Sequence, residues 1–234
     1  MEKIIIKDME FLKIKDKNIN VLFSTAKNNV SYKLNDIDTS KNFEVLQEIF
    51  DVKKVNYTNQ VHGDNIINLD FNESKDKEAD GLIISKANEI LGVFTADCVP
   101  VIIYDPDKDV IATIHSGWKG TILDISKQAV NILKEKYKCE NINVVIGPAV
   151  GACCYQVSDE LVHRFNEKYG ESVSKGRMLD LKKVIRFQLH GMVNKDKITD
   201  LGICTNCYED LEFHSYRKKK EEAGRLFSFA FIDR

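Results

Sequence analysis

Three short segments of this sequence join an apolar run to polar residues that can do chemistry. They are residues 59–63 (Asn-Gln-Val-His-Gly), 95–100 (Thr-Ala-Asp-Cys-Val-Pro) and 114–118 (Ile-His-Ser-Gly-Trp). A strand that ends in such a turn fixes a side chain in place and leaves it accessible. The three segments therefore predict functional side chains at the ends of strands.

His62, Cys98 and His115 are the metal-binding candidates of these segments. Neutral imidazoles and a thiolate are strong zinc ligands, and three ligands leave the fourth tetrahedral position for water or substrate. The ligands are dispersed along the chain, whereas structural zinc sites usually contain paired ligands at short separations. The pattern fits a catalytic zinc site, and the alternative without function is a buried thiol with two hydrogen-bonded histidines.

The same residues also fit a cysteine nucleophile. Cys98 would attack with His115 or His62 as its base, and Asp97 would orient the base, polarise a water or shuttle a proton. Sequence spacing does not separate this arrangement from zinc binding. A serine nucleophile at Ser116 is disfavoured because no Gly-x-Ser-x-Gly turn surrounds it.

Cys204 and Cys207 form a Cys-x-x-Cys pair, the strongest local metal-like pattern of the chain. A structural zinc site would need a second pair of ligands. The cysteines at 153–154 are neighbours that we do not expect to bind one ion together, so His190 or His214 would have to complete the site. We therefore expect all cysteines outside the three segments above to be structural thiols.

Two glycine-bounded turns follow predicted strands. Residues 117–120 open a helix, whose backbone N–H groups and dipole favour phosphate or another anion. This turn is not a P-loop, since the required Gly and Lys spacing is absent. Residues 147–155 can line a pocket in which Tyr155 stacks on a ligand or hydrogen-bonds to it.

Strands and helices are mixed along the chain and must position these segments. Apolar runs bounded by Asp, Gly and Pro predict strands at residues 3–7, 19–23, 54–57, 65–69, 81–84, 90–95, 100–104, 110–114, 143–146 and 225–232. Apolar residues at helical spacing predict helices at 40–50, 120–135, 158–170 and 179–192. Ser40 and Ser158 are the expected N-caps, and Gly170 the expected end of the third helix.

The order of these elements predicts a mixed α/β fold, because strict βαβ alternation is absent. No linker, composition break or repeat divides the chain, so we expect a single domain over residues 1–234. Charge clusters at 75–77 and 218–222 predict solvated loops or faces.

Composition narrows the class of protein. The 34 Lys and Arg against 36 Asp and Glu leave a net charge of −2, which predicts neither a nucleic-acid nor an anionic membrane partner. The chain offers no apolar run of transmembrane length and no signal peptide, so we expect a cytoplasmic protein. Six cysteines in 234 residues are too few for a disulfide-stapled secreted domain, and we expect free thiols.

In order along the chain, these motifs resemble the laccase-domain family, also called the multicopper polyphenol oxidase family. That family includes the bacterial peptidoglycan editing factor and purine nucleoside phosphorylases. The resemblance spans nearly the whole chain and implies a single α/β domain with β-sheets layered between helices. It is carried by residues 59–63, 79–81, 95–100, 115–121, 146–155 and 213–232.

The resemblance also implies a ligand set and an activity. The family's zinc-binding His, Cys and His match His62, Cys98 and His115 of this chain. Members phosphorolyse adenosine, inosine, guanosine and S-methyl-5'-thioadenosine, with phosphate attacking the ribose C1′, and some also deaminate adenosine. Copper fits less well than zinc, because three dispersed ligands cannot fill the several copper sites of a multicopper oxidase. The alternatives are a metal-free Cys/His amide hydrolase in cell-wall precursor (peptidoglycan) editing and a copper-dependent polyphenol oxidase.

The chain departs from the family pattern at two positions. Ala26 stands where the family usually has Arg, and Gln156 stands where Glu is common. An anion contact at the first position would have to come from Lys27, and a carboxylate at the second is lost. Arg217 and Arg225 remain to bind phosphate bidentately. The preferred nucleoside, the balance of phosphorolysis and deamination, and the oligomeric state are open.

Overall fold

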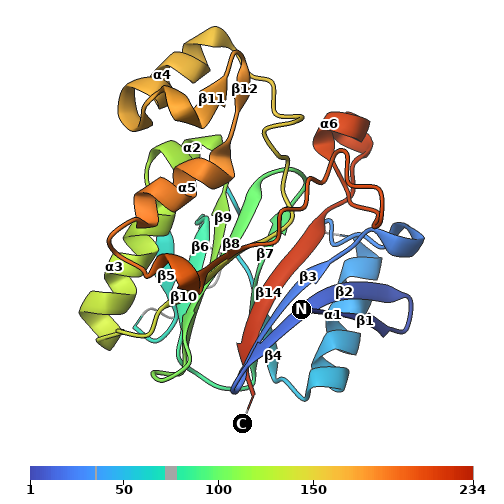
Figure 1. Ribbon diagram of the computed structural model, residues 1–234. Coiled ribbons are helices and arrows are strands. Elements are labelled where there is room, and N and C mark those ends of the chain that lie inside the picture. The colour runs from blue at the N-terminus through green and yellow to red at the C-terminus, as the bar shows by residue number, and fades with distance from the viewer. Residues whose placement is uncertain (35, 72–77, 234) are drawn as a thin grey trace.

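The computed structural model describes residues 1–34, 36–71 and 78–233, and it contains two six-stranded mixed sheets (Figure 1). The first sheet has the strand order β1-β2-β3-β14-β7-β4. Its strands are β1 (Glu2–Ile6), β2 (Met9–Asp16), β3 (Ile19–Ser24), β14 (Leu226–Ile232), β7 (Glu89–Thr95) and β4 (Lys54–Asn56). All pairs are antiparallel except β4 with β7.

The second sheet has the strand order β13-β10-β8-β9-β6-β5. Its strands are β13 (Ile198–Asp200), β10 (Asn143–Ile146), β8 (Val99–Asp105), β9 (Val110–Ser116), β6 (Gly81–Ile84) and β5 (Ile66–Asn68). The two outer pairs are parallel and the inner three are antiparallel. A separate short hairpin joins β11 (Ser174–Lys175) and β12 (Met178–Leu179).

Helices cover the outer faces of the two sheets. The helices are α1 (Ile37–Phe50), α2 (Trp118–Ile122), α3 (Ile125–Tyr137), α4 (Asp159–Tyr169), α5 (Leu181–Leu189) and α6 (Tyr216–Lys219). Helix α1 packs on the first sheet, and α3 and α5 pack on the second (Figure 1). The expected mixed α/β fold with sheets between helices is confirmed. No helix within the described ranges has both the length and the apolarity needed to span a membrane.

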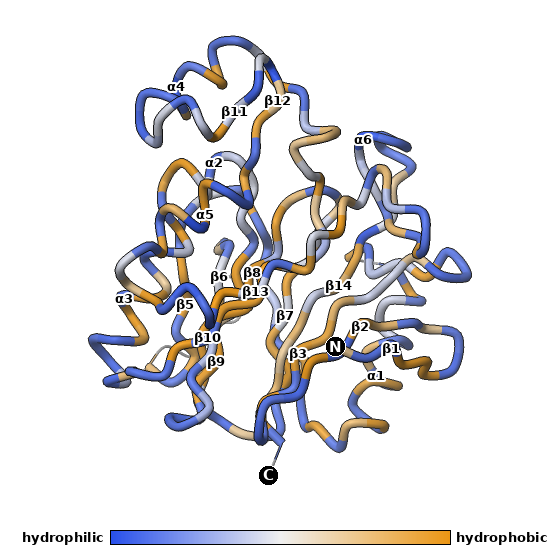
Figure 2. Tube along the Cα trace, viewed as in Figure 1, coloured by the Kyte–Doolittle hydropathy of each residue, from blue (hydrophilic) through white to orange (hydrophobic). Residues whose placement is uncertain are grey.

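The core lies in three layers because the central strands are buried on both faces. In β14, three phenylalanines face α1, whereas Leu226, Ala230 and Ile232 face the second sheet. All seven residues of this strand are buried, so its alternation separates aromatic from aliphatic side chains rather than buried from exposed ones. Figure 2 shows hydrophobic residues along the strands of both sheets and a largely hydrophilic α4.

The chain passes between the two sheets at two points that matter for function. Residues 57–65 lead from β4 of the first sheet to β5 of the second. Residues 96–98 lead from β7 of the first sheet to β8 of the second. So short a crossing needs a sharp turn, and Asp97 adopts a positive φ of 89° within it.

Two expectations about helices are wrong, and one strand has no counterpart among the expected elements. Helix α1 begins at Ile37 because the side chain of Asp36, not that of Ser40, accepts the hydrogen bond of the first turn. The helix expected at 120–135 is broken into α2 and α3 at Asp124, which adopts a left-handed φ of 62°. Strand β2 was not expected, because its turn at Lys7 and Asp8 lacks the glycine or asparagine that usually marks a hairpin.

The observed ends of the later helices agree more closely with the expected ones. Ser158 caps α4 through its hydroxyl, and Gly170 ends it, as expected. Helix α5 is shorter than the expected 179–192, since Met178 and Leu179 belong to β12. The charge cluster at 218–222 is exposed, as expected, whereas the cluster at 75–77 lies outside the described residues.

Candidate metal and substrate site

The structure brings His62, Cys98 and His115 together. One ligand atom from each lies within 4.8 Å of the others. His62 comes from the first crossing between the sheets, Cys98 from the second, and His115 from the end of β9. The two imidazole rings meet edge to face, with centroids 4.8 Å apart. This is a donor set of two imidazoles and one thiol with room for a further ligand.

Asp80 anchors two of these three residues. Its Oδ1 accepts a hydrogen bond from Nδ1 of His115 at 2.7 Å. The same carboxylate accepts the backbone N–H groups of Val61 at 3.3 Å, His62 at 3.0 Å and Gly63 at 2.6 Å. Asp80 is fully buried. Because Nδ1 of His115 is engaged, its Nε2 is left to face the metal position, as is usual for metal-binding histidines.

Cys98 and His115 hold each other in their charged forms when no metal is bound. Burial alone would raise the pKa of the Cys98 thiol, but His115 and His62 outweigh it and lower that pKa to about 6. Burial alone would lower the pKa of His115, but the Cys98 thiolate and Asp80 raise it to about 9. At neutral pH the metal-free site is therefore a thiolate beside an imidazolium.

The backbone next to the three side chains has two unusual positions, a left-handed residue at His62 and a glycine in close contact at Gly117. His62 adopts a positive φ of 60°, a left-handed conformation that the three hydrogen bonds to Asp80 maintain. A Cβ at Gly117 would lie 3.2 Å from Sγ of Cys98 and 3.2 Å from Cδ2 of His62. Glycine at this position thus leaves the metal-binding atoms free of a crowding side chain.

The three candidate ligands open into a cavity of about 700 Å³. Arg217, Arg225 and Lys33 contribute positive charge to its wall, and Tyr155 and Trp118 contribute aromatic surface. The remaining lining residues are Leu34, Thr58, Asn59, Gln60, Phe94, Thr95, Ala96, Asp97, Val150, Leu181 and Tyr216. A volume of this size is typical of pockets that bury a small-molecule ligand.

The two arginines are held in different ways. The guanidinium of Arg217 lies over the ring of Tyr155, 4.6 Å from its centroid. Nη1 of Arg225 donates to the carbonyls of Ala223 and Gly224, each at 3.0 Å. One edge of the Arg225 guanidinium is thereby fixed, and its other N–H groups are left for a ligand.

Asp97 lies in the cavity wall, but both oxygens of its carboxylate already accept hydrogen bonds from the protein. Oδ1 accepts from the hydroxyl of Thr205 at 2.7 Å, and Oδ2 accepts from the backbone N–H of Arg217 at 2.8 Å. Its backbone carbonyl accepts from Val150 at 2.9 Å. Asp97 therefore ties three wall segments together, and proton shuttling by this residue stays a prediction.

The two departures from the family pattern lie away from the cavity lining. Lys27 contacts Glu10, with Nζ 3.4 Å from Oε2, and does not line the cavity. Ala26 is buried in the core between the sheets. Gln156 is exposed and forms an isolated bridge with Met178. None of the three is placed to contact a ligand beside the metal position.

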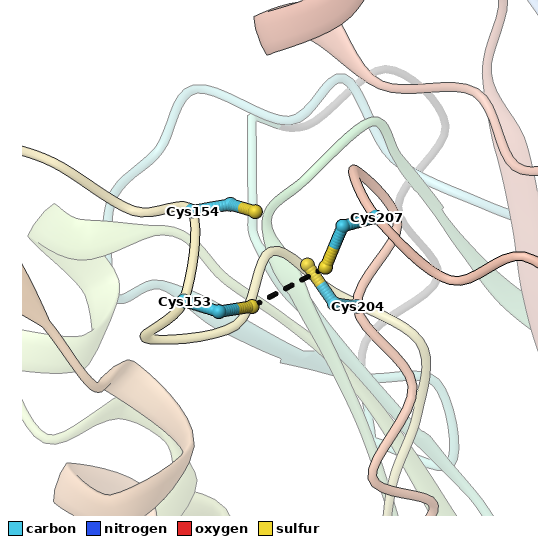
Figure 3. A group of neighbouring side chains, drawn as sticks. All are labelled: Cys153, Cys154, Cys204 and Cys207. Atoms are coloured by element: carbon cyan, nitrogen blue, oxygen red, sulfur yellow. Dashed lines mark hydrogen bonds between the residues drawn. The ribbon is translucent and has the colours of Figure 1, made fainter.

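Four of the remaining cysteines form a second group of possible metal ligands, and their geometry corrects only the expectation that the neighbours at 153–154 cannot approach one ion together. Cys153, Cys154, Cys204 and Cys207 bring their sulfur atoms within 4.8 Å of one another (Figure 3). The neighbours at 153–154 do point toward one common position, because the loop that carries them turns sharply. Neither expected histidine helps, since His214 bonds to the carbonyl of Val30 and His190 is exposed at the end of α5.

Asp80 is the functional residue that sequence reasoning did not assign. It stands in the motif Ala79-Asp80-Gly81, where an Asp-Gly pair is more typical of a turn than of a buried anchor. The signal that would have found it is chemical, because a histidine that binds metal needs an acceptor for its other ring nitrogen. The carboxylate nearest in sequence to a ligand, Asp97, was considered instead.

A family model described as multi-copper polyphenol oxidoreductase laccase matches residues 22–233 of the chain. The chain is 40% identical over 224 residues to a purine nucleoside phosphorylase from Clostridium acetobutylicum. The aligned region covers 94% of each of the two chains. It is 30% identical over 217 residues to the purine nucleoside phosphorylase YlmD of Bacillus subtilis, covering 83% of this chain and 77% of that one.

Solved structures show the same fold. The chain is similar to the crystal structure of a hypothetical protein, YfiH, from Bacillus licheniformis, with a TM-score of 0.82 and 27% sequence identity. The similarity covers 95% of this chain and 96% of that one. The two sheets and their helices are therefore a shared architecture, and the three ligands lie within the residues that the family model matches.

Proposed function

Because the chain belongs to the family of multi-copper polyphenol oxidoreductase laccases, we propose that it is a zinc-dependent purine nucleoside phosphorylase. The observation that carries this proposal is the placement of a His/Cys/His ligand set and two arginines on one cavity of about 700 Å³. The names of the Clostridium and Bacillus relatives support the same activity.

The donor set favours zinc over copper. Two imidazoles and one thiolate with an open fourth position are the ligands of catalytic zinc sites. The chemistry of a multicopper oxidase needs several copper ions held mainly by histidines. Within the described ranges, the other possible ligand cluster contains four cysteines and no histidine. The copper in the family's description is therefore not the metal we assign to this chain.

We assign the two substrates to different side chains of the cavity wall. Arg217 and Arg225 would hold phosphate through charge-assisted hydrogen bonds, and Tyr155 and Trp118 would stack on the purine ring. An oxygen of phosphate would then attack C1′ of the ribose while the bond from C1′ to the purine nitrogen breaks, and the purine leaves with the electron pair. Zinc, when bound, would polarise a substrate oxygen in the cavity. The residues around it supply position and charge.

Asp97 acts in this proposal as a positioning residue. By accepting the backbone N–H of Arg217 and the hydroxyl of Thr205, it fixes the start of α6 against the loop before it. Arg217 can then keep its guanidinium over Tyr155 without closing the cavity.

Adenosine deamination would use the same cavity, with adenosine bound and water in place of phosphate. The chain's six free thiols fit a reducing, cytoplasmic setting.

The direct test is phosphorolysis by zinc-loaded protein. We expect hypoxanthine from inosine and phosphate, expect no product from chelator-stripped protein, and expect activity to return when zinc is added. Adenosine, guanosine and S-methyl-5'-thioadenosine are tested in the same way, with inosine formed from adenosine as the readout for deamination. Loaded protein that releases no base from any of these nucleosides would contradict the proposal.

Arg217→Ala is expected to lower kcat/KM for phosphate about 10- to 100-fold, because a hydrogen bond to a charged group contributes roughly 1.5–3 kcal/mol. The loss should appear mainly in the KM for phosphate, and Arg217→Lys should restore part of it. Arg177→Ala is the matched control, since Arg177 donates to the carbonyl of Val157 outside the cavity lining. An unchanged KM for phosphate in Arg217→Ala would remove Arg217 from the phosphate site.

Zinc activation should depend on pH in a defined direction. Between the pKa values of Cys98, about 6, and His115, about 9, metal binding must displace the proton of His115. The zinc concentration that restores half of the activity should therefore fall about tenfold for each unit rise in pH over this window. Zinc-buffered activity assays from pH 6.5 to 8.5 measure this half-activating zinc concentration. A constant midpoint would show that His115 is already neutral in the metal-free protein.

One observation favours a second candidate function. The Cys98 thiolate, the His115 imidazolium that has taken the thiol proton and can give it to the leaving amine, and the Asp80 carboxylate that orients His115 match the groups of a metal-free amide hydrolase. Cell-wall precursor peptides would be its substrates. A substitution of His62 distinguishes the two functions, because the hydrolase does not need this residue. His62→Ala should abolish zinc-dependent phosphorolysis, whereas amide hydrolysis that survives both this change and chelation would favour the hydrolase.

A further inference from the structure

Four cysteines form a compact cluster away from the His62, Cys98 and His115 site. They come from two loops, one after β10 that carries Cys153 and Cys154 and one after β13 that carries Cys204 and Cys207. Figure 3 shows all four side chains directed toward a common centre. The nucleoside reaction proposed above uses none of them.

The spacing of the sulfur atoms fits one tetrahedral ion. A zinc to sulfur distance of about 2.3 Å requires sulfurs about 3.8 Å apart on the edges of the tetrahedron. In the structure all four sulfurs lie within 4.8 Å of one another, and Sγ of Cys153 lies 3.4 Å from Sγ of Cys207. Small side-chain rotations bring these distances to the tetrahedral value.

The backbone explains how adjacent cysteines reach the same ion. The N–H groups of Cys154 and Tyr155 both donate to the carbonyl of Gly151, at 2.9 and 3.0 Å. This tight turn places consecutive side chains on one side of the loop. The second loop turns in a similar way, since the N–H of Tyr208 donates to the carbonyl of Cys204 at 3.0 Å.

The surroundings compensate for negative charge on the sulfurs. The backbone N–H of Gly151 donates to Sγ of Cys204 at 3.2 Å. Lys182, Lys183 and Arg186 line a hollow that Cys153 and Cys204 share. Asp180 and Asp200 lie in the same hollow, so three cations face two carboxylates there. An ion with four thiolates carries a net charge of −2, which this excess of positive charge and the N–H donor partly offset.

We propose that Cys153, Cys154, Cys204 and Cys207 bind a second zinc ion, which is structural and distinct from the ion at His62, Cys98 and His115. Four thiolates leave no open position, so this ion takes no part in the chemistry. Cys153 and Cys207 are exposed, which gives zinc access to the cluster from solvent. The inference does not depend on the nucleoside substrates.

The second ion would join two loops that build the substrate cavity. The first loop continues into Tyr155, which supports Arg217. The second carries Thr205, which donates to Asp97. The loops already meet through the backbone, where the N–H of Thr205 donates to the carbonyl of Ala149 at 3.0 Å. The zinc ion would thus fix the part of the cavity wall that carries Tyr155 and contacts Asp97.

Elemental analysis of zinc and iron in protein purified under reducing conditions tests the proposal. We expect two zinc ions per wild-type chain, one in Cys207→Ser, one in Cys98→Ala and none in the double variant. Cys139→Ala is the matched control and should keep both, because Cys139 is buried beneath α3 and apart from both clusters. Should Cys207→Ser fail to fold, Cys153→Ser repeats the measurement at the other exposed cysteine.

The outcomes separate the two sites. Cys98→Ala with two zinc ions would contradict the catalytic site and leave the four-cysteine site standing. A Cys207→Ser chain with the same zinc content as wild type would overturn the four-cysteine site. Iron in place of zinc, or a disulfide between Cys153 and Cys207 in intact-mass analysis of the freshly purified protein before any reductant is added to the sample, would overturn it as well. Cobalt substitution in Cys98→Ala should give an absorption spectrum of tetrahedral thiolate ligation that Cys207→Ser abolishes.

Discussion

Cys98→Ala is expected to lower kcat/KM for inosine phosphorolysis about 10³-fold, because the loss of several kcal/mol of metal-supplied stabilisation reduces the rate tenfold per 1.36 kcal/mol. The substitution removes the thiolate, which is the only anionic ligand among the three. His62 and His115 alone form a weak site, and zinc should be lost on dialysis. Hypoxanthine release and zinc content are measured on the same preparation.

The experiment on Cys98→Ala must distinguish a loss of metal-dependent activity from a loss of folded protein. Cys98 lies in a three-residue crossing rather than in a core cluster, but its thiolate pairs with the His115 imidazolium in the metal-free protein. The melting temperature and circular dichroism spectrum of the metal-free variant are therefore compared with those of metal-free wild type, and the variant should unfold cooperatively. Cys139→Ala removes a thiol at the end of α3 and should keep full activity per zinc bound. Phosphorolysis at the wild-type rate in Cys98→Ala would falsify the assignment of this cysteine as a ligand.

Asp80→Asn is expected to weaken zinc binding and kcat/KM by about 10- to 100-fold, the usual effect of removing the acceptor that orients a ligand histidine. An asparagine amide cannot accept from His115 and from three backbone N–H groups together. Unpaired buried donors also cost stability, and we expect the free energy of unfolding to fall by about 1–3 kcal/mol. Urea denaturation of the metal-free protein and zinc titration measure the two effects separately.

Asp64→Asn provides the control for this substitution. Asp64 lies in the same loop and accepts a hydrogen bond from the Gln128 amide at 2.9 Å. We expect both its stability and its zinc affinity to stay close to wild type, with a stability change within about 0.5 kcal/mol. If Asp80→Asn loses stability but keeps wild-type zinc affinity, Asp80 supports the fold only and does not orient His115.

The sequence pattern identified His62, Cys98 and His115 as candidate ligands because each lies at or after the end of an apolar run. The structure brings one ligand atom of each within 4.8 Å of the others. Spacing alone did not separate metal binding from a cysteine nucleophile or a buried thiol with hydrogen-bonded histidines, and metal binding stays a prediction. The arginines were different, since Arg217 and Arg225 were identified by resemblance and not by spacing. The structure places both on the same cavity as the ligands. Their contact with phosphate stays a prediction.

The four-cysteine cluster was beyond sequence reasoning for a physical reason. Its halves lie about fifty residues apart on separate loops, and only the pairing of β10 with β13 brings the loops together. The chain offered one recognisable half, Cys-x-x-Cys, and an adjacent pair that resembles no usual ligand motif. The turn that directs both neighbours to one side depends on hydrogen bonds to Gly151 that spacing does not reveal.

The division of strands between two sheets was equally hidden. The central strands β8 of the second sheet and β14 of the first are buried along their whole length, because each has a neighbouring layer on both faces. Such strands have no polar face to show which sheet they belong to. The expected segments for β7, β8 and β9 were correct to within two residues, but their partition required the structure.

Two of the crossings between the sheets give a bound metal a further consequence for stability. His62 and Cys98 lie on two of the connections that pass from one sheet to the other, so an ion bound by both would resist sliding of the sheets past each other. Zinc at the proposed site would bind the assembled pair and not the separated sheets. Its binding energy would therefore add to cohesion between the two sheets, by about 1.4 kcal/mol for each tenfold excess of free zinc over the dissociation constant. The cell's free zinc level would thereby set how firmly the two sheets are held together.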